Sequence, residues 1–381
     1  MGYFWNANQE ADLRVKETID FLVKAAIQYL GDDILSIILM GSFARGEGIW
    51  KKLEERIEIL SDIDLLVVLK GHKRIPTQLS EEIRRIKNKM NIQIDIRFKS
   101  SFRLRFYPKD THTYDYLHIS QVIYGRDIKK LFPRVFREDI GKSDIEALFF
   151  NRAKNNIKEC SPAYLTSNSG KDLLMLNYMA AKTMFTCTDI MSIYHRNYSP
   201  FIDERIKFGR ENLKTFGILP ERFLEDLDIA HRFVFEQPAA PTIENIRDYW
   251  ARARGYLLRL FLFANGRKNE FNEIFNYPFS LRLSCVEKIR LFYKRIKFVR
   301  VLWKRYNRFT LFRRFHPVIY CRMASLMLYM AIDKDKEEAY TRKALEYFSN
   351  LYHLENEMGK TGDIWMTLRS NLLEFHKAGL F

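Results

Sequence analysis

Two carboxylates at the start of a buried strand constrain the possible fold and site of this chain more than any other sequence feature. Residues 62–69 (DIDLLVVL) are predicted to form a buried strand that opens on Asp62 and Asp64. Side chains at positions i and i+2 of a strand point to the same side, so the two carboxylates project together while Ile63 packs behind them. Burying such a pair without a partner costs free energy. A divalent cation would remove that conflict, so the pattern predicts a site for a hard metal ion.

A glycine-serine turn follows the preceding strand. Residues 34–40 (ILSIILM) form a β-branched apolar run of strand length, which predicts a buried strand. Gly41 and Ser42 come directly after it. Gly41 would let the backbone approach a phosphate closely, and the Ser42 hydroxyl and the N–H groups of a following helix would bind phosphate oxygens.

A third predicted strand supplies another carboxylate. Residues 92–98 (IQIDIRF) alternate in polarity, so the isoleucines and Phe98 share one face and Gln93, Asp95 and Arg97 share the other. Asp95 brought alongside the first pair would complete a site for oxygen-liganded metals such as Mg²⁺. Two such ions can clamp the attacking and leaving oxygens in phosphoryl or nucleotidyl transfer.

These residues resemble a known family. The strand–Gly-Ser–helix turn, the Asp-x-Asp strand and the later lone Asp resemble the DNA polymerase β-type nucleotidyltransferase superfamily. The sequence GSFARGEG…SDIDLLVVL is most similar to the minimal and aminoglycoside-type members of this superfamily. The resemblance covers roughly residues 20–130. It implies a mixed sheet with flanking helices. It also implies transfer of a nucleoside monophosphate from an NTP, with ATP expected, and release of pyrophosphate.

The resemblance assigns a role to each matching residue. Gly41 and Ser42 would hold the β- and γ-phosphates. Asp62 and Asp64 would bind two Mg²⁺ ions. Asp95 would bind the catalytic ion and help to activate the acceptor hydroxyl.

Two basic residues are further candidates for nucleotide binding. Arg45 could assist a phosphate oxygen or form a solvent-facing salt bridge with Glu47. Lys182 lies in an otherwise apolar helical stretch, YMAAKTMF. In related two-domain enzymes a lysine of the helical domain faces the triphosphate; the alternative is a lysine whose stem lies along the helix surface.

The spacing departs from the family pattern at one place. Nineteen residues separate Ser42 from Asp62, which is more than the family usually has. An inserted element over residues 49–60 would absorb the excess. A hairpin around Glu54-Glu55 and a short helix both fit its sequence.

The rest of the chain changes to helical patterns after about residue 140. The predicted fold class is therefore α+β, with a mixed-sheet α/β domain followed by an all-α region. The predicted domains are 1–140, 141–266 and 267–381. Helical spacing is found at residues 143–159, 171–195, 202–215, 220–236, 243–265, 288–312, 318–331 and 335–356. The aromatic and basic stretch 195–210 could line an acceptor pocket or form an ordinary loop between helices.

Positive charge is concentrated in one segment. The net charge is +16, and residues 288–332 hold 12 Lys/Arg and no Asp or Glu. Residues 288–314 fit a basic amphipathic helix rich in aromatic side chains. Three roles remain open for it: docking on the helical domain with a solvated basic face, weak contact with an anionic membrane surface, or binding to nucleic-acid phosphates.

Cysteine spacing and hydropathy indicate the compartment. The four cysteines lie far apart and match no zinc spacing, which favours a reduced cytoplasmic protein. The longest clean apolar run is ten residues, Met323–Ile332, whereas a spanning helix needs about 20. The first residues lack a signal-peptide pattern. We expect a cytoplasmic protein, and contact with a membrane surface is one of the three roles open to the basic segment.

The expected activity is Mg²⁺-dependent nucleotidyl transfer to a hydroxyl of a small molecule or a protein. One alternative is a non-catalytic protein that keeps this fold and binds a membrane or nucleic acid through its basic helix. Another is an enzyme that acts on nucleic-acid 3′ ends. The three intact carboxylates favour catalysis, and the position of the charge outside the site strands disfavours a nucleic-acid substrate.

Overall fold

The computed structural model describes residues 2–53, 56–71, 74–160, 169–236 and 246–266, together with Arg342, Ala344 and residues 368–370. The chain divides into two compact units, each formed by two segments. The first unit comprises Met1–Ile145 and Ala180–Ala264, and the second comprises Glu146–Met179 and Asn265–Phe381. The predicted division into three domains stays a prediction. The basic segment 288–314 lies outside the described ranges, and so do the predicted helices beyond residue 266, apart from Arg342 and Ala344 in the predicted helix 335–356.

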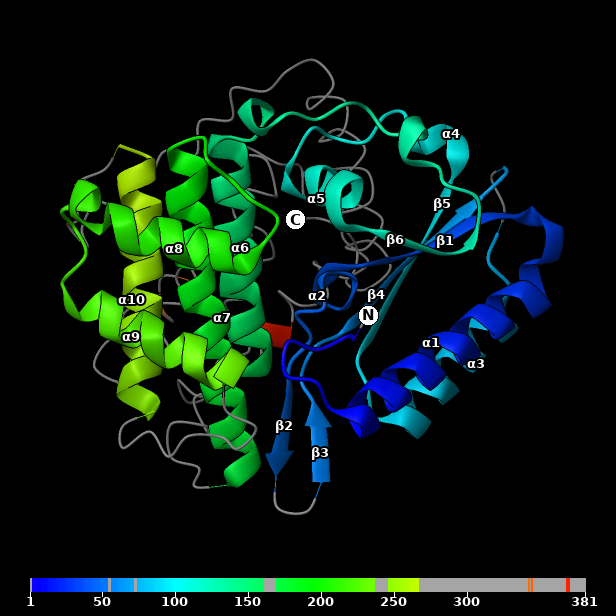
Figure 1. The fold of residues 1–381 in the computed structure, drawn as a ribbon, viewed down its shortest axis with the longest axis horizontal. Coiled ribbons are helices and arrows are strands. Elements are labelled where there is room, and N and C mark those ends of the chain that lie inside the picture. The colour runs from blue at the N-terminus through cyan, green and yellow to red at the C-terminus, as the bar shows by residue number, and fades with distance from the viewer. Residues whose placement is uncertain are drawn as a thin grey trace. The chain divides into compact units, whose positions relative to one another are not determined.

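Within the described part of the first unit, the centre is a four-stranded mixed sheet with the order β5-β4-β1-β6 (Figure 1). Its strands are β1 (Ile34–Met40), β4 (Ile63–Leu69), β5 (Ile94–Ser100) and β6 (Gln121–Gly125). β1 runs antiparallel to β4 and β6, whereas β4 and β5 are parallel. β1 and β4 are central and nearly completely buried, which explains their uninterrupted apolar sequences.

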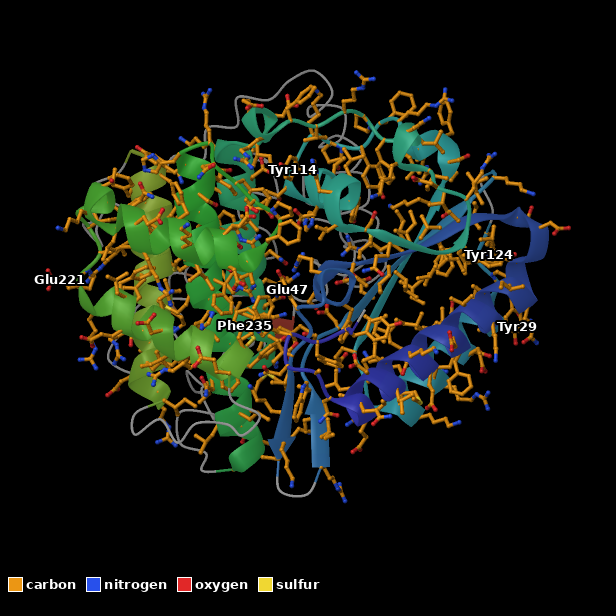
Figure 2. All side chains as sticks on the ribbon, viewed as in Figure 1. Tyr29, Glu47, Tyr114, Tyr124, Glu221 and Phe235 are labelled. Carbon is orange, nitrogen blue, oxygen red and sulfur yellow. The ribbon has the colours of Figure 1, made fainter. Side chains whose placement is uncertain are left out.

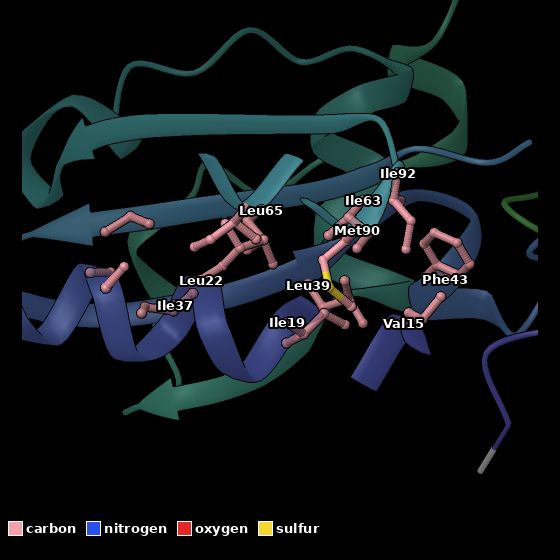
Figure 3. Packing of buried hydrophobic residues seen from close by; sticks show 14 of the residues in the cluster. Val15, Ile19, Leu22, Ile37, Leu39, Phe43, Ile63, Leu65, Met90 and Ile92 are labelled. Atoms are coloured by element: carbon pink, nitrogen blue, oxygen red, sulfur yellow. The ribbon is translucent and has the colours of Figure 1, made fainter. Parts of the chain in front are cut away.

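One face of the sheet is covered by two helices that lie side by side, α1 (Gln9–Leu30) and α3 (Thr77–Met90) (Figure 1). The Asn8 side chain caps α1 by accepting from the Ala11 N–H at 2.8 Å, and the helix ends at Gly31. The core between these helices and the sheet is apolar (Figure 3); it includes Val15, Ile19, Leu22, Ile37, Leu39, Ile63, Leu65, Met90 and Ile92.

The other face of the sheet is covered by shorter elements. These are α4 (Ser101–Leu104), α5 (Thr111–Ile119) and a 3₁₀ turn at Lys129–Leu131. Leu104, Tyr116, Ile128 and Phe132 pack there against Leu35, Ile38, Met40, Leu66 and Val68. The sheet is therefore buried on both sides, which places polar groups at the strand ends.

The inserted element is a hairpin. β2 (Trp50–Leu53) and β3 (Arg56–Ile59) pair antiparallel and form a two-stranded sheet of their own. The ammonium of Lys51, which is almost completely buried, lies 4.7 Å from the centre of the Phe233 ring. The hairpin thus sits outside the central sheet, so the long spacing before Asp62 does not disturb β4.

The later part of the described chain is helical, and no strand follows Gly125 in the described ranges. Its helices are α6 (Lys142–Glu159), α7 (Gly170–Tyr194), α8 (Ile202–Asn212), α9 (Arg222–His231) and α10 (Ile246–Ala264). A 3₁₀ turn, Leu213–Phe216, extends α8, and a π-helical turn, Arg232–Glu236, extends α9. The predicted fold class, a mixed α/β sheet domain followed by helices, is confirmed. Within the described ranges, no helix is both long and apolar enough to cross a membrane.

Candidate functional site

Strand register brings the predicted site residues into one row. Asp64 is paired in register with Asp95 of β5 on one side and with Met40 of β1 on the other. Gly41 follows Met40 directly, as the first residue of α2 (Gly41–Arg45). Asp62 stands immediately before β4, two residues from Asp64. The glycine-serine turn and the three carboxylates therefore meet at the same end of three neighbouring strands.

Gly41 is suited to its position in two independent ways. Its φ is +67°, in the left-handed region that glycine adopts readily and other residues rarely do. A Cβ at this position would also overlap the carboxylate of Asp64. The turn thus presents bare backbone directly beside a site carboxylate. Ser42 follows as the second residue of α2, and its carbonyl accepts from the Glu47 N–H at 2.9 Å.

The electrostatics show that these groups act on one another. Burial, followed by the charges of Asp62 and Asp95, raises the pKa of Asp64 to about 7. The charges of Arg97 and Lys182 oppose this shift. These two cations therefore do not fully offset the three carboxylates. A divalent cation would supply the remaining positive charge, so the donor set fits a hard metal ion.

Lys182 reaches this site from the helical part of the first unit. It lies in α7 and is half-buried, and its charge acts on Asp64. This proximity supports the prediction that Lys182 belongs to the nucleotide site.

Asp95 is engaged by an arginine that the sequence analysis did not single out. Arg97 donates to Asp95 Oδ2 through Nη2 at 2.7 Å and Nε at 3.1 Å, and its Nη1 donates to the Tyr116 hydroxyl at 3.3 Å. Within the described part of the chain, no three His, Cys, Asp or Glu side chains are arranged as a metal site. A metal bound by all three carboxylates would therefore require their side chains to move closer together.

Arg45 takes the second of its two predicted roles, an ion pair with Glu47, but in a different setting. The pair is buried, with side-chain exposures of 15% for Arg45 and 5% for Glu47, rather than facing solvent. Glu47, directly after α2 (Figure 2), also accepts from the Ile202 N–H at 3.2 Å, at the start of α8. Glu47 thus ties the glycine-serine turn to the helical part of the first unit.

A buried polar cluster lies close to the contact between Glu47 and Ile202. The Tyr198 hydroxyl donates to both oxygens of Asp115, at 3.2 and 3.3 Å. Arg205 forms an ion pair with Asp189 at 2.5 Å and donates to the Ser199 carbonyl at 2.6 Å. Burial raises the pKa of Asp115 to about 7, while the charges of Arg45 and Arg205 oppose that shift.

The stretch 195–210 therefore forms a loop between α7 and α8, followed by α8 itself. Tyr198, Ser199 and Pro200 are buried in that loop. The loop contributes to the polar cluster with Asp115. A role in lining an acceptor pocket stays a prediction.

Sequence reasoning missed several of these residues for different reasons. Arg97 could have been found, because it shares a strand face with Asp95 two residues away. The contact between Asp115 and Tyr198 joins residues 83 positions apart, and neither lies in a motif.

Among the comparisons with known proteins, matches were found to solved structures. No family model matches the chain, and no curated protein matches it. The structure is similar to spectinomycin adenyltransferase AAD(9) from Enterococcus faecialis, solved with ATP and spectinomycin. The sequence identity is 15% and the TM-score is 0.39, over 64% of this chain and 98% of the other. Similarity this low leaves the function to be inferred from the side chains of this chain.

Proposed function

We propose that this protein is a metal-dependent nucleotidyltransferase. It transfers a nucleoside monophosphate from an NTP, with ATP and Mg²⁺ expected, to a hydroxyl of a small molecule or protein, and it releases pyrophosphate. The observation that carries the proposal is the strand register that aligns Gly41, Asp64 and Asp95, with Asp62 beside them.

The donor set assigns the metal ligands. Asp62 and Asp64 would hold two ions, and Asp95 would be the third carboxylate of the catalytic one. When bound, these ions would stabilise the charge that develops on the attacking and leaving oxygens. Burial and the charges of Asp62 and Asp95 raise the pKa of Asp64, and a bound metal would offset this cost of ionising Asp64.

The other residues of the row would bind and orient the nucleotide. Gly41 lets the backbone of the turn lie directly against the Asp64 carboxylate, where a Cβ would overlap it, so phosphates bound by the turn would lie beside the metal ligands. Lys182 contributes positive charge for the triphosphate. Ser42 would bind the same phosphates through its hydroxyl.

Asp95 would change partners during the reaction. Asp95 released from Arg97 would be available to hold the metal and to accept the proton of the acceptor hydroxyl. Arg97 keeps a second partner, the Tyr116 hydroxyl, which would retain the guanidinium beside the site. The oxygen of the acceptor then attacks the α-phosphorus, and pyrophosphate leaves with the electrons of the broken P–O bond.

The experiment that tests this function is label transfer. The protein is incubated with each α-labelled NTP, Mg²⁺ and a cell extract, and the labelled products are separated by size. We expect transfer by the wild type and by the control Asp20→Asn/Asp32→Asn, which removes two exposed carboxylates from outside the site. We expect none from Asp62→Asn/Asp64→Asn. Equal labelling with that site variant would refute the proposal.

A further inference from the structure

An exposed ridge of aromatic and basic side chains follows β5. It consists of Phe102, Arg103, Arg105 and Phe106, and all four residues are exposed. The two phenylalanines are 65% and 62% exposed, and their ring centroids lie 5.1 Å apart. Two neighbouring phenylalanines so far out of the core indicate a surface that meets another apolar phase.

The fold holds this ridge outward. Leu104, in the middle of the segment, is completely buried in the core on the second face of the sheet. The Tyr107 ring packs against Phe132 with centroids 5.3 Å apart. Backbone bonds from the Phe106 N–H to Arg103 at 3.2 Å and from the Tyr107 N–H to Leu104 at 3.1 Å fix the turn. The exposure of the ridge is therefore built into a well-anchored turn.

Basic side chains surround the ridge. Residues 96–109 contain five Lys/Arg and no Asp or Glu, and of these five Arg97 pairs with Asp95 and Lys109 pairs with Asp139. The turn Lys129–Leu131 lies against α4 and adds two lysines. Of the other acids near the ridge along the chain, Asp110 caps α5, and Asp127 accepts from the Lys129 N–H. The ridge thus combines apolar tips with a basic surround.

We propose that this ridge docks the protein on an anionic phospholipid surface. Phenylalanine has no polar atom, so its exposed ring gains free energy by entering the interface between lipid headgroups and acyl chains. The arginines beside it would contact lipid phosphates. The two rings are tilted by 59° against each other, which suits joint insertion better than parallel stacking on nucleic-acid bases. The proposal uses no residue of the segment 288–314 and does not depend on the proposed activity.

Vesicle co-sedimentation of the full chain tests the proposal. We expect binding to phosphatidylcholine vesicles that contain phosphatidylglycerol, weakening with salt, and no binding to phosphatidylcholine alone. Phe102→Ala/Phe106→Ala should weaken binding at least about tenfold, and Arg103→Gln/Arg105→Gln about 30-fold. The control Leu13→Ala/Phe21→Ala removes exposed apolar side chains from α1 and should bind like the wild type.

Several results would overturn the proposal. The wild type could fail to bind the anionic vesicles, or the phenylalanine variant could bind them as tightly as the wild type, which would assign the binding to another segment. Loss of binding to a single-stranded oligonucleotide in both ridge variants, without vesicle binding by the wild type, would make the ridge a nucleic-acid surface instead. Circular dichroism confirms that each variant is folded. Label transfer in solution should be unchanged in the phenylalanine variant, so the two proposals can fail separately.

Discussion

Truncating Glu47 should destabilise the protein far more than truncating an ordinary surface glutamate. The Glu47 side chain is 5% exposed and accepts from both the Arg45 guanidinium and the Ile202 N–H. Glu47→Ala would leave a largely buried guanidinium and a backbone N–H without this acceptor. Removing one member of a buried ion pair costs about 3–5 kcal/mol.

Another carboxylate lowers that cost. Burial raises the pKa of Asp115, and the charge of Arg45 opposes that shift, so Asp115 lies near enough to compensate Arg45 in part. We therefore expect Glu47→Ala to lower the free energy of unfolding by about 3 kcal/mol. This corresponds to a fall in Tm of roughly 6–12 °C.

Urea unfolding followed by circular dichroism measures this loss. The matched control is Glu82→Ala, which breaks an exposed i,i+3 pair with Arg85 and should cost less than about 1 kcal/mol. Glu47→Gln keeps an acceptor for Ile202 and should fall between the two. In an Arg45→Met background, Glu47→Ala should cost much less, because no buried charge is left unpaired. A Glu47→Ala loss no larger than that of Glu82→Ala would refute the reasoning.

Three further predictions concern the site itself. The pKa of Asp64 is raised from 3.8 to about 7, so the contribution of Asp64 to stability falls as pH rises from about 4 through 7. Without metal, Asp64→Asn should therefore have a higher melting temperature than the wild type at pH 8. A lower melting temperature there would contradict the raised pKa of Asp64. Gly41→Ala should abolish NTP binding measured by titration and also lower Tm, because φ is positive and the new Cβ overlaps Asp64; unchanged binding would show that the turn does not contact phosphate. Asp95→Asn should keep most NTP binding but lower turnover by orders of magnitude, and near wild-type turnover would make Asp95 a surface carboxylate.

The strands and helices with strong local signals were predicted from the sequence almost to the residue. β1 ends at Met40 because an apolar run meets a glycine, and α7 spans Gly170–Tyr194 where helical spacing predicted residues 171–195. β6 was not predicted. It is a short edge strand, QVIYG, with three of its five residues exposed, so it shows no apolar pattern.

The hairpin at residues 50–59 shows where local sequence is insufficient. Its apolar residues, Trp50, Leu53, Ile57 and Ile59, fit both a short helix and two paired strands. Contacts with distant residues accompany the hairpin: the Trp50 Nε1–H donates to the Asn6 carbonyl at 2.9 Å, and Lys51 lies over Phe233. The sequence of the segment itself does not predict such contacts.

The site, too, combines features that local sequence predicts with features that depend on distant contacts. The three carboxylates were predicted because strand spacing and polarity place them, and the register of β4 with β5 brings Asp64 beside Asp95. The ion pair of Arg97 with Asp95 and the burial of Glu47 depend on rotamers and on packing against α8. Sequence spacing carries no information on either.

Isothermal titration of ATP in the presence of Mg²⁺ tests the central claim most directly. It measures nucleotide binding at the site formed by the turn and the carboxylates, and it does so without knowledge of the acceptor. The wild type and the control Asp20→Asn/Asp32→Asn should bind ATP only when the metal is present. Asp62→Asn/Asp64→Asn should lose that binding while remaining folded. Equal, metal-dependent ATP binding by the site variant would contradict the assignment of these carboxylates as metal ligands.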